Sequence, residues 1–181
     1  MAFPEAAEAA RLDLLRPWRF RLWLWKTLPL AAFAGLQVRR LDEAACEVTL
    51  PGGWRSQNPF RSTYFAAQAM AAEMSTGAPA TLLVQGQGVS VAMLVTSVRA
   101  TYIKKIVGPS VFAFAEVPAM REAVQRAIAS GEGVTFVARS VGRTWEGTVA
   151  SEFEITWSFK KRAGTGEPES PGGVGGRTVS R

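Results

Sequence analysis

The chain has 181 residues, of which 48% are hydrophobic and 20% charged, a composition typical of one soluble globular domain with a substantial core. It has no histidine and one cysteine, Cys46, which excludes histidine-dependent catalysis, histidine-liganded metals, internal disulfides and multi-cysteine metal centres. The formal net charge of +6 comes from short, scattered basic clusters without a nucleic-acid-binding motif, so we expect no nucleic-acid partner.

Residues 1–34 predict a helical segment that packs on the main domain. Its apolar run, RPWRFRLWLWKTLPLAAFAGL, superficially resembles a secretion signal or a membrane anchor. Lys26 and Pro29 interrupt this run well short of the roughly 20 apolar residues that span a bilayer. We therefore expect no stable membrane insertion and a cytoplasmic protein. The run contains three tryptophans, Trp18, Trp23 and Trp25. We expect them to pack against a sheet or a second subunit, the alternative being an interfacial helix at lipid headgroups.

Two short strands follow from Gly35 onward. The stretches LQVRRL and CEVTL both alternate with period two, and Asp42, Glu43 and Ala44 between them predict a hairpin. Cys46 begins the second of these strands and is expected in the core.

The stretch NPFRSTYFAAQAMAAEMSTG, residues 58–77, predicts a long helix that is apolar almost all round and therefore lies inside the protein. Asn58 or Ser62 would cap its first turn, and Asn58, which precedes Pro59, could instead contact substrate. Thr76 and Gly77 would begin its end, although the following PATLLVQ could add another helical turn.

The remaining elements complete an α+β pattern. Residues 89–106 predict one long strand and SVFAFAEV another, after which Pro118 begins an amphipathic helix that Gly131 ends. Two strands close the domain, and in the last one Phe153, Ile155, Trp157 and Phe159 alternate with polar residues. Residues 163–181 are rich in glycine, proline and charge and predict a disordered tail.

This order of elements predicts the fold. Hairpin connections imply an antiparallel sheet, and a single dominant helix that must be covered on every side implies that the sheet wraps around it. We therefore predict a hotdog fold over residues 35–162. A hotdog sheet leaves a long edge, so we expect two copies to pair as a homodimer or a dimer of dimers.

Glu73 is the only acidic residue of the long helix. A carboxylate inside a protein is costly unless it is paired, protonated or used in chemistry, and burial raises its pKa toward the range of a useful general base. At about 100° per residue, Ala66, Ala69 and Met70 share its side of the helix, where they leave room for a ligand or allow close packing. The alternative role of Glu73 is structural, in an arginine pair or a subunit contact.

The helix resembles the central-helix signature of hotdog-fold acyl-coenzyme A thioesterases, most nearly a branch of uncharacterised bacterial thioesterase-like domains. The similar element order runs from about Gly35 to Lys161. In the phenylacetate-pathway type, the signature is Asn, two residues, Gly, two residues, His-Gly-Gly, and an Asp seven residues after the second of these glycines. Asn58 matches the Asn and Glu73 occupies the position of the acid.

Other signature positions differ, because Arg61 replaces the first glycine and Tyr64, Phe65 and Ala66 replace His-Gly-Gly. The resemblance implies a hydrolase of acyl-coenzyme A or acyl-carrier thioesters, with Glu73 as general base or nucleophile and coenzyme A present only as part of the substrate. Backbone N–H groups of Tyr64, Phe65 and Ala66, at the positive end of the helix dipole, would stabilise the oxyanion.

Several residues are candidates for substrate binding. Lys104 and Lys105 end the long strand where related thioesterases carry basic residues near the phosphates of coenzyme A, and Arg61 could act likewise. Gln68 could bond backbone across a dimer or a substrate amide, and Tyr102 could line an acyl tunnel or merely pack. The alternative function is a non-catalytic acyl-binding, coenzyme A-binding or structural hotdog protein.

Overall fold

The computed structural model describes residues 3–162. The predicted tail, residues 163–181, lies outside this range. The helices are α1 (Glu5–Leu15), α2 (Pro17–Thr27), α3 (Pro29–Ala34), α4 (Phe65–Val84) and α5 (Val117–Ser130). The strands are β1 (Gln37–Leu41), β2 (Cys46–Leu50), β3 (Val91–Tyr102), β4 (Ser110–Phe114), β5 (Val134–Thr144) and β6 (Val149–Lys161).

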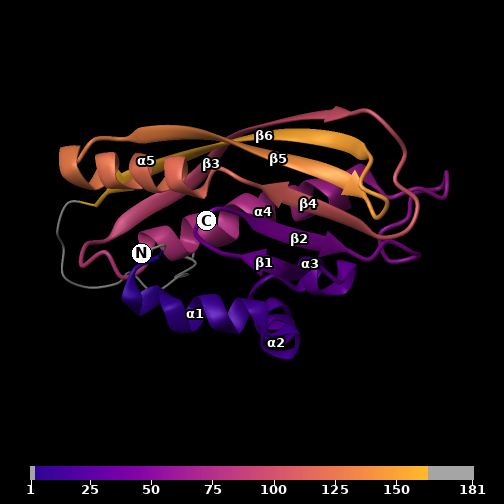
Figure 1. Ribbon diagram of the computed structural model, residues 1–181, viewed down its shortest axis with the longest axis horizontal. Coiled ribbons are helices and arrows are strands. Elements are labelled where there is room, and N and C mark those ends of the chain that lie inside the picture. Colours follow the sequence, from indigo (N-terminus) through magenta and orange to yellow (C-terminus); the bar gives the residue numbers. More distant parts are fainter. Residues whose placement is uncertain (1–2, 163–181) are drawn as a thin grey trace, which may run out of the picture.

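The six strands form one sheet in the order β1-β2-β4-β5-β6-β3, and every neighbouring pair is antiparallel. The sheet curves over α4, which runs along its concave side (Figure 1). Strand β6 shows how the sequence specifies this arrangement, because Phe153, Ile155, Trp157 and Phe159 are all buried, as their alternation predicts. The predicted antiparallel sheet around one long helix is therefore confirmed.

Two polar contacts fix α4 to the sheet. The Ser75 and Ser140 hydroxyls lie 2.8 Å apart, and the indole Nε1 of Trp157 donates to Thr76 Oγ1 at 3.0 Å. All four side chains are buried, so each bond satisfies groups that water cannot reach. These bonds determine which side of α4 faces the sheet and which side remains open.

The start of α4 corrects the prediction of a capping side chain. The helix begins at Phe65, its N-cap is Tyr64, and neither Asn58 nor Ser62 caps it. Asn58 Oδ1 instead accepts hydrogen bonds from the backbone N–H groups of Phe60 at 3.0 Å and Ser62 at 3.1 Å. The side chain therefore stabilises a tight turn that precedes the helix, a local arrangement that competes with capping.

The end of α4 lies beyond the predicted Thr76 and Gly77, and the alternative in which PATLLVQ continues the helix is confirmed. The helix continues through Gly77 and Pro79 to Val84 and buries Leu82 and Leu83 in the core. Burial of two leucines outweighs the unfavourable local preferences of glycine and proline, which amount to a few kcal/mol.

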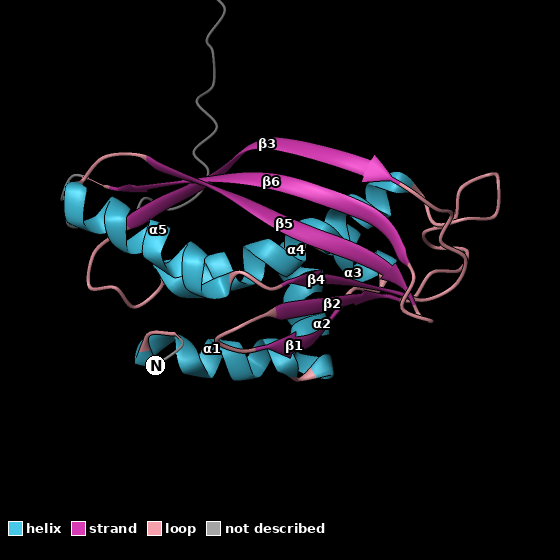
Figure 2. Cartoon of the chain, turned by 45° about the horizontal axis from the view of Figure 1, so that its top comes forward, coloured by secondary structure: helices cyan, strands magenta, loops and turns pink. Residues whose placement is uncertain are grey.

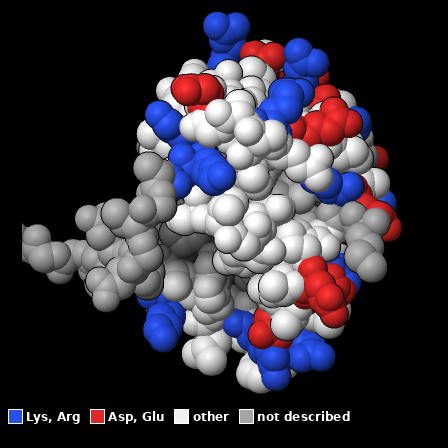
Figure 3. Space-filling view, turned by 90° about the vertical axis from the view of Figure 1, so that its left-hand side faces the viewer, with Lys and Arg blue, Asp and Glu red and all other residues white. Residues whose placement is uncertain are grey.

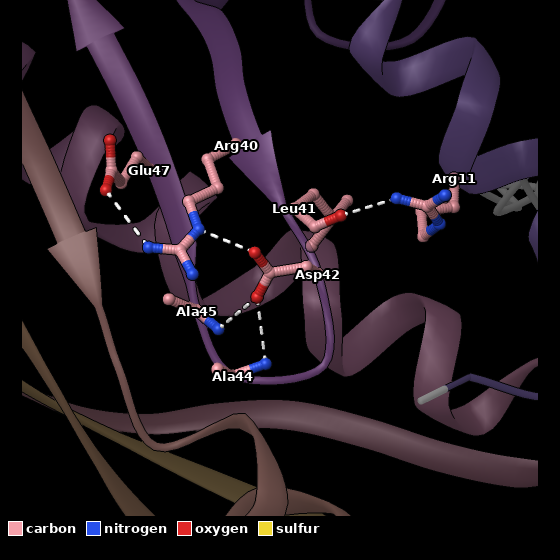
Figure 4. A network of polar contacts seen from close by, with 7 residues as sticks. All are labelled: Arg11, Arg40, Leu41, Asp42, Ala44, Ala45 and Glu47. Atoms are coloured by element: carbon pink, nitrogen blue, oxygen red, sulfur yellow. Dashed lines mark hydrogen bonds and ion pairs between the residues drawn. The ribbon is translucent and has the colours of Figure 1, made fainter. Parts of the chain in front are cut away.

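The hairpin between β1 and β2 is confirmed and is fixed by Asp42. Its Oδ1 accepts from the backbone N–H groups of Ala44 and Ala45, and its Oδ2 accepts from Arg40 Nε at 2.6 Å (Figure 4). The hydrogen bond from Arg40 lowers the pKa of Asp42 below its usual value. Arg11 of α1 donates to the backbone oxygen of Leu41 at 2.7 Å, which joins α1 to this end of β1.

The two edges of the sheet differ. β1 has five residues, contains a bulge and is contacted by both α1 and α2. β3 has 12 residues, most of them exposed, and lies at the other edge of the sheet beside β6 (Figure 2). A long unprotected edge strand is a site for pairing with another strand.

Gly142 gives a test of the packing in this sheet. It pairs with Phe112 on β4 and with Ser151 on β6, and a Cβ at this position would lie 2.6 Å from the Phe112 ring. We expect Gly142→Ala to lower the free energy of unfolding by about 1–3 kcal/mol, because the ring must shift in a closely packed core. Urea denaturation measures this.

The matched control is Gly133→Ala. A Cβ at Gly133 meets no atom within 4 Å, so the change should alter stability by less than about 0.5 kcal/mol. Equal effects at Gly142 and Gly133 would contradict the packing described for β4 and β5.

Candidate active site

Glu73 lies on the one side of α4 that the sheet leaves partly open. Ala66, Ala69, Met70 and Glu73 are all partly exposed, whereas their neighbours Ala67, Gln68, Ala71, Ala72 and Met74 are buried. The predicted common face of these four residues is therefore present, and it is the face through which a ligand or a second subunit could reach the helix.

The carboxylate of Glu73 borders a cavity of about 610 Å³ between α4, β3, β6 and the N-terminal helices α1 and α2. Most of the wall is apolar. The residues that line it are Ala10, Asp13, Leu14, Trp18, Arg19, Phe20, Leu22, Trp23, Lys26, Leu28, Glu73, Met74, Gly77, Ala78, Thr81, Leu82, Gln85, Met93 and Trp157. This volume and lining suit an apolar chain of a small-molecule ligand.

The environment of Glu73 raises its pKa above the usual value, because burial disfavours the ionised carboxylate. Within residues 3–162 its side chain takes part in no ion pair, so the predicted alternative of an arginine pair is not present there. Gly77 provides space for the carboxylate, since a Cβ at Gly77 would lie 2.7 Å from Glu73 Oε1. A carboxylate with a raised pKa is a stronger base than an ordinary glutamate.

A second cavity of about 530 Å³ lies at the N-terminal end of α4. Asn58, Tyr64, Phe65, Gln68, Tyr102, Lys104 and Lys105 are among its lining residues, so the structure brings most of the predicted binding residues together. Glu73 does not line this cavity. The eight-residue step from Phe65 to Glu73 corresponds to about 12 Å along the helix axis.

The first turn of α4 offers two backbone donors instead of the predicted three. The N–H of Tyr64 donates to the backbone oxygen of Ser56 at 2.7 Å, which removes Tyr64 from the expected set. The N–H groups of Phe65 and Ala66 have no hydrogen-bond partner in the described part of the chain, as expected at the start of a helix. They can bind an anionic oxygen.

Gln68 is 5% exposed, and its two amide atoms differ in their surroundings. Its Nε2 donates to the backbone oxygen of Thr63 at 3.2 Å, whereas its buried Oε1 has no hydrogen-bond partner within residues 3–162. A buried acceptor without a donor is costly, so this oxygen is suited to an N–H or O–H group of a ligand.

The other two candidates differ in position. Tyr102 packs edge-on against Phe65 and Phe153, with ring centroids 6.5 and 5.7 Å away, and lines the second cavity. Arg61 lines neither cavity and has a positive φ of 58°, the backbone region that glycine favours. The resembled signature has glycine at the position of Arg61. The positive φ explains this, because glycine adopts such a φ more readily than other residues do.

Sequence reasoning identified Glu73 but not the wall that faces it. Trp18 and Trp23 of α2 line the cavity beside Glu73, although about 50 residues separate them in sequence. The cluster of tryptophans in α2 indicated that this segment packs against another part of the protein. It did not indicate that the segment packs beside Glu73.

A comparison of sequences with family models gives one match. Residues 16–159 match a family described as a domain of unknown function (DUF4442). No curated protein matches the chain in a sequence comparison.

Solved structures show which fold the chain shares. Protein OLEI01261 of Chlorobaculum tepidum, described as of unknown function, is 15% identical with a TM-score of 0.67, and the match covers 82% of this chain and 98% of that one. PA5026 of Pseudomonas aeruginosa, described as a probable thioesterase, is 16% identical with a TM-score of 0.66, covering 90% and 100%. Thioesterase HI1161 of Haemophilus influenzae is 15% identical with a TM-score of 0.60, covering 89% and 96%. The predicted hotdog fold of a thioesterase-like domain is thus confirmed.

The raised pKa of Glu73 predicts how stability depends on pH. The folded protein holds the Glu73 proton more tightly than the unfolded chain does, so folding stability is lost as pH rises from about 4.3 through the folded pKa. We expect Glu73→Gln to lack this loss, so that its free energy of unfolding exceeds that of the wild type by a margin that grows with pH. Urea denaturation between about pH 4 and pH 8 measures it.

Glu152→Gln is the control, because Glu152 is an exposed carboxylate on β6. Its effect should vary little over the same range. A constant difference between Glu73→Gln and the wild type at all pH values would show that Glu73 is not desolvated in the folded protein.

Proposed function

The chain belongs to the family described as a domain of unknown function (DUF4442), and from the fold that it shares with structures described as thioesterases and the geometry of its two cavities we propose that it hydrolyses acyl thioesters of coenzyme A or an acyl carrier. The observation that carries the proposal is Glu73, a partly buried carboxylate that has no ion pair within residues 3–162 and lies beside an apolar cavity of about 610 Å³. The cavity would hold the acyl chain, and Glu73 would act at the thioester.

The exposed edge β3 supports assembly of two copies. Val98 and Tyr102 are 52% and 46% exposed, although their β6 partners Ile155 and Ser151 are both buried. They lie on the concave side of the sheet at its margin, where the described residues of one copy do not cover them. Pairing of β3 with a second β3 would cover both the edge and these side chains.

Such a dimer would join the two cavities. Met93, near the start of β3, lines the Glu73 cavity, and Tyr102, at its end, lines the cavity at the start of α4. In an antiparallel pair centred on the strand, the start of one β3 lies beside the end of the other. Glu73 of one copy would then share a site with Phe65 and Ala66 of the other.

The proposed reaction needs only groups of this chain and water. Glu73 would take a proton from a water molecule that attacks the thioester carbonyl carbon, or would itself attack that carbon as nucleophile. The N–H groups of Phe65 and Ala66 would stabilise the oxygen that becomes negative. The C–S bond then breaks, and the products after addition of water are a carboxylic acid and a thiol.

The second cavity suits the coenzyme A portion of the substrate. The Oε1 atom of Gln68 could accept a hydrogen bond from an amide N–H of the pantetheine arm. Lys104 and Lys105, which border the same cavity, could bind its phosphates. Asn58 would act through the turn that it stabilises ahead of the helix.

The alternative is a hotdog protein that binds acyl groups or coenzyme A without turnover. The observation in its favour is that Tyr64, Phe65 and Ala66 replace the His-Gly-Gly of the resembled thioesterases.

Hydrolysis of a panel of acyl-coenzyme A thioesters separates the two functions. We expect the wild type to release thiol and Glu73→Gln to lower kcat by roughly 10²–10⁴-fold, because the amide cannot accept the proton. Glu152→Gln should retain wild-type kcat. Turnover that survives Glu73→Gln would refute the role of Glu73, and binding without turnover would favour the alternative function.

Subunit mixing tests whether the site is shared. Phe65→Pro removes one oxyanion donor at the first helical position, where proline is well tolerated, and Phe65→Ala keeps the donor but removes the ring. We expect an equimolar mixture of inactive Glu73→Gln and Phe65→Pro subunits, after exchange, to regain about one quarter of wild-type activity, because half the dimers carry one intact site of two.

A mixture that stays inactive, although exchange is complete, would place each site within one subunit. Loss of activity in Phe65→Ala as large as in Phe65→Pro would show that the ring matters and not the N–H group.

A further inference from the structure

Helix α2 has apolar side chains on two opposite faces. Phe20 and Leu24 are buried against the protein. Trp18, Leu22 and Trp25 lie on the opposite face of the helix and are 66%, 66% and 49% exposed. At about 100° per residue, these three side chains fall within roughly 60° of one another. We call them the outer stripe of α2.

Basic residues flank the outer stripe on both sides. On the same helical projection, Arg21 lies about 40° beyond Trp25 on one side and Lys26 about 40° beyond Leu22 on the other. Neither takes part in an ion pair within residues 3–162, whereas Arg16 and Arg19 both pair with Asp13. From residue 14 to residue 36 the chain has four basic residues and no acidic one.

We propose that the outer stripe of α2 docks on the surface of an anionic lipid bilayer. Tryptophan, leucine and flanking lysine or arginine are the residues that bind the boundary between headgroups and acyl chains, with cations extended to anionic headgroups. The helix has 11 residues and is about 16 Å long, which suits a position in the plane of the membrane. No helix in the described part of the chain is both long enough and apolar enough to cross a bilayer.

The charge around α2 favours lipid over a second copy of this chain. Two copies meeting through this stripe would bring Arg21 and Lys26 of each close to the same cations of the other, and α2 itself has no acidic residue to pair with them. The end of the molecule seen in Figure 3 differs from α2 in its charge, because basic and acidic side chains are interspersed there. An anionic surface is complementary to the single sign of charge on α2.

The position of α2 connects docking with the cavity. Trp18, Leu22 and Lys26, which belong to or flank the outer stripe, also line the cavity that holds Glu73. Bilayer contact would therefore place that cavity beside the membrane, where long-chain acyl groups partition. This step, unlike docking itself, rests on the proposed function, and it names long-chain acyl thioesters as the substrate class.

Binding to vesicles tests docking without any need for turnover. The probe is vesicles of phosphatidylcholine with about 30% phosphatidylglycerol, compared with phosphatidylcholine alone. We expect co-sedimentation and a blue shift of tryptophan fluorescence with the anionic vesicles, and weaker binding as salt is raised. The triple variant Trp18→Ser, Leu22→Ser, Trp25→Ser should lose at least about tenfold in partitioning. The double variant Arg21→Gln, Lys26→Gln should partition to anionic vesicles roughly fivefold less per substituted residue, and its partitioning to phosphatidylcholine alone should not change.

Trp145→Ser is the matched control. Trp145 is also exposed, at 57%, but lies in the hairpin between β5 and β6, so vesicle binding should be unchanged. Glu73→Gln should also bind like the wild type, which separates docking from hydrolysis. Absence of vesicle binding, or binding that the triple variant retains, would overturn the proposal. So would a wild-type oligomer that only the triple variant dissociates, because the stripe would then contact another copy.

Discussion

The hydrogen bond from the Trp157 indole to the Thr76 hydroxyl sets the rotation of α4 beneath the sheet. Together with the contact between Ser75 and Ser140, it holds two adjacent residues of the helix against β5 and β6. Each such buried bond contributes only about 1 kcal/mol to stability. The larger effect of these bonds is on the orientation of α4. Because the helix cannot rotate about its axis, Glu73 faces the cavity and the neighbouring buried residues face the core.

The same packing explains why Glu73 is tolerated without an ion pair in the part of the chain that the structure describes. Trp157 and Gly77 leave space for the carboxylate, since a side chain at Gly77 would meet both Glu73 Oε1 and the Trp157 ring. Burial raises the pKa of Glu73 without an ion pair to lower it, so the carboxyl group costs stability at neutral pH. Proteins keep such groups mainly where chemistry needs them.

Sequence patterns predicted the elements whose periodicity reflects burial. The alternation of Phe153, Ile155, Trp157 and Phe159 predicted β6, and the unbroken apolar character of α4 predicted a central helix. The ends of α4 were not predictable in this way, because the turn around Asn58 and the burial of Leu82 are tertiary effects that override local preferences. Glu73 could be found because a lone acid in an apolar helix is conspicuous, but the wall of its cavity comes from a segment about 50 residues away.

The division of the candidate site follows from the length of a helix. Glu73 and the N–H groups of Phe65 and Ala66 belong to one rigid element and lie about 12 Å apart along it, so a single copy cannot bring them to one carbonyl group. Neither cavity alone holds both a base and oxyanion donors. The edge β3 has residues of both cavities at its two ends, so in the proposed dimer each copy would supply the group that the other copy's cavity lacks. An unprotected edge strand is ordinarily a liability for aggregation, and its persistence in this chain is accounted for if the edge completes the site.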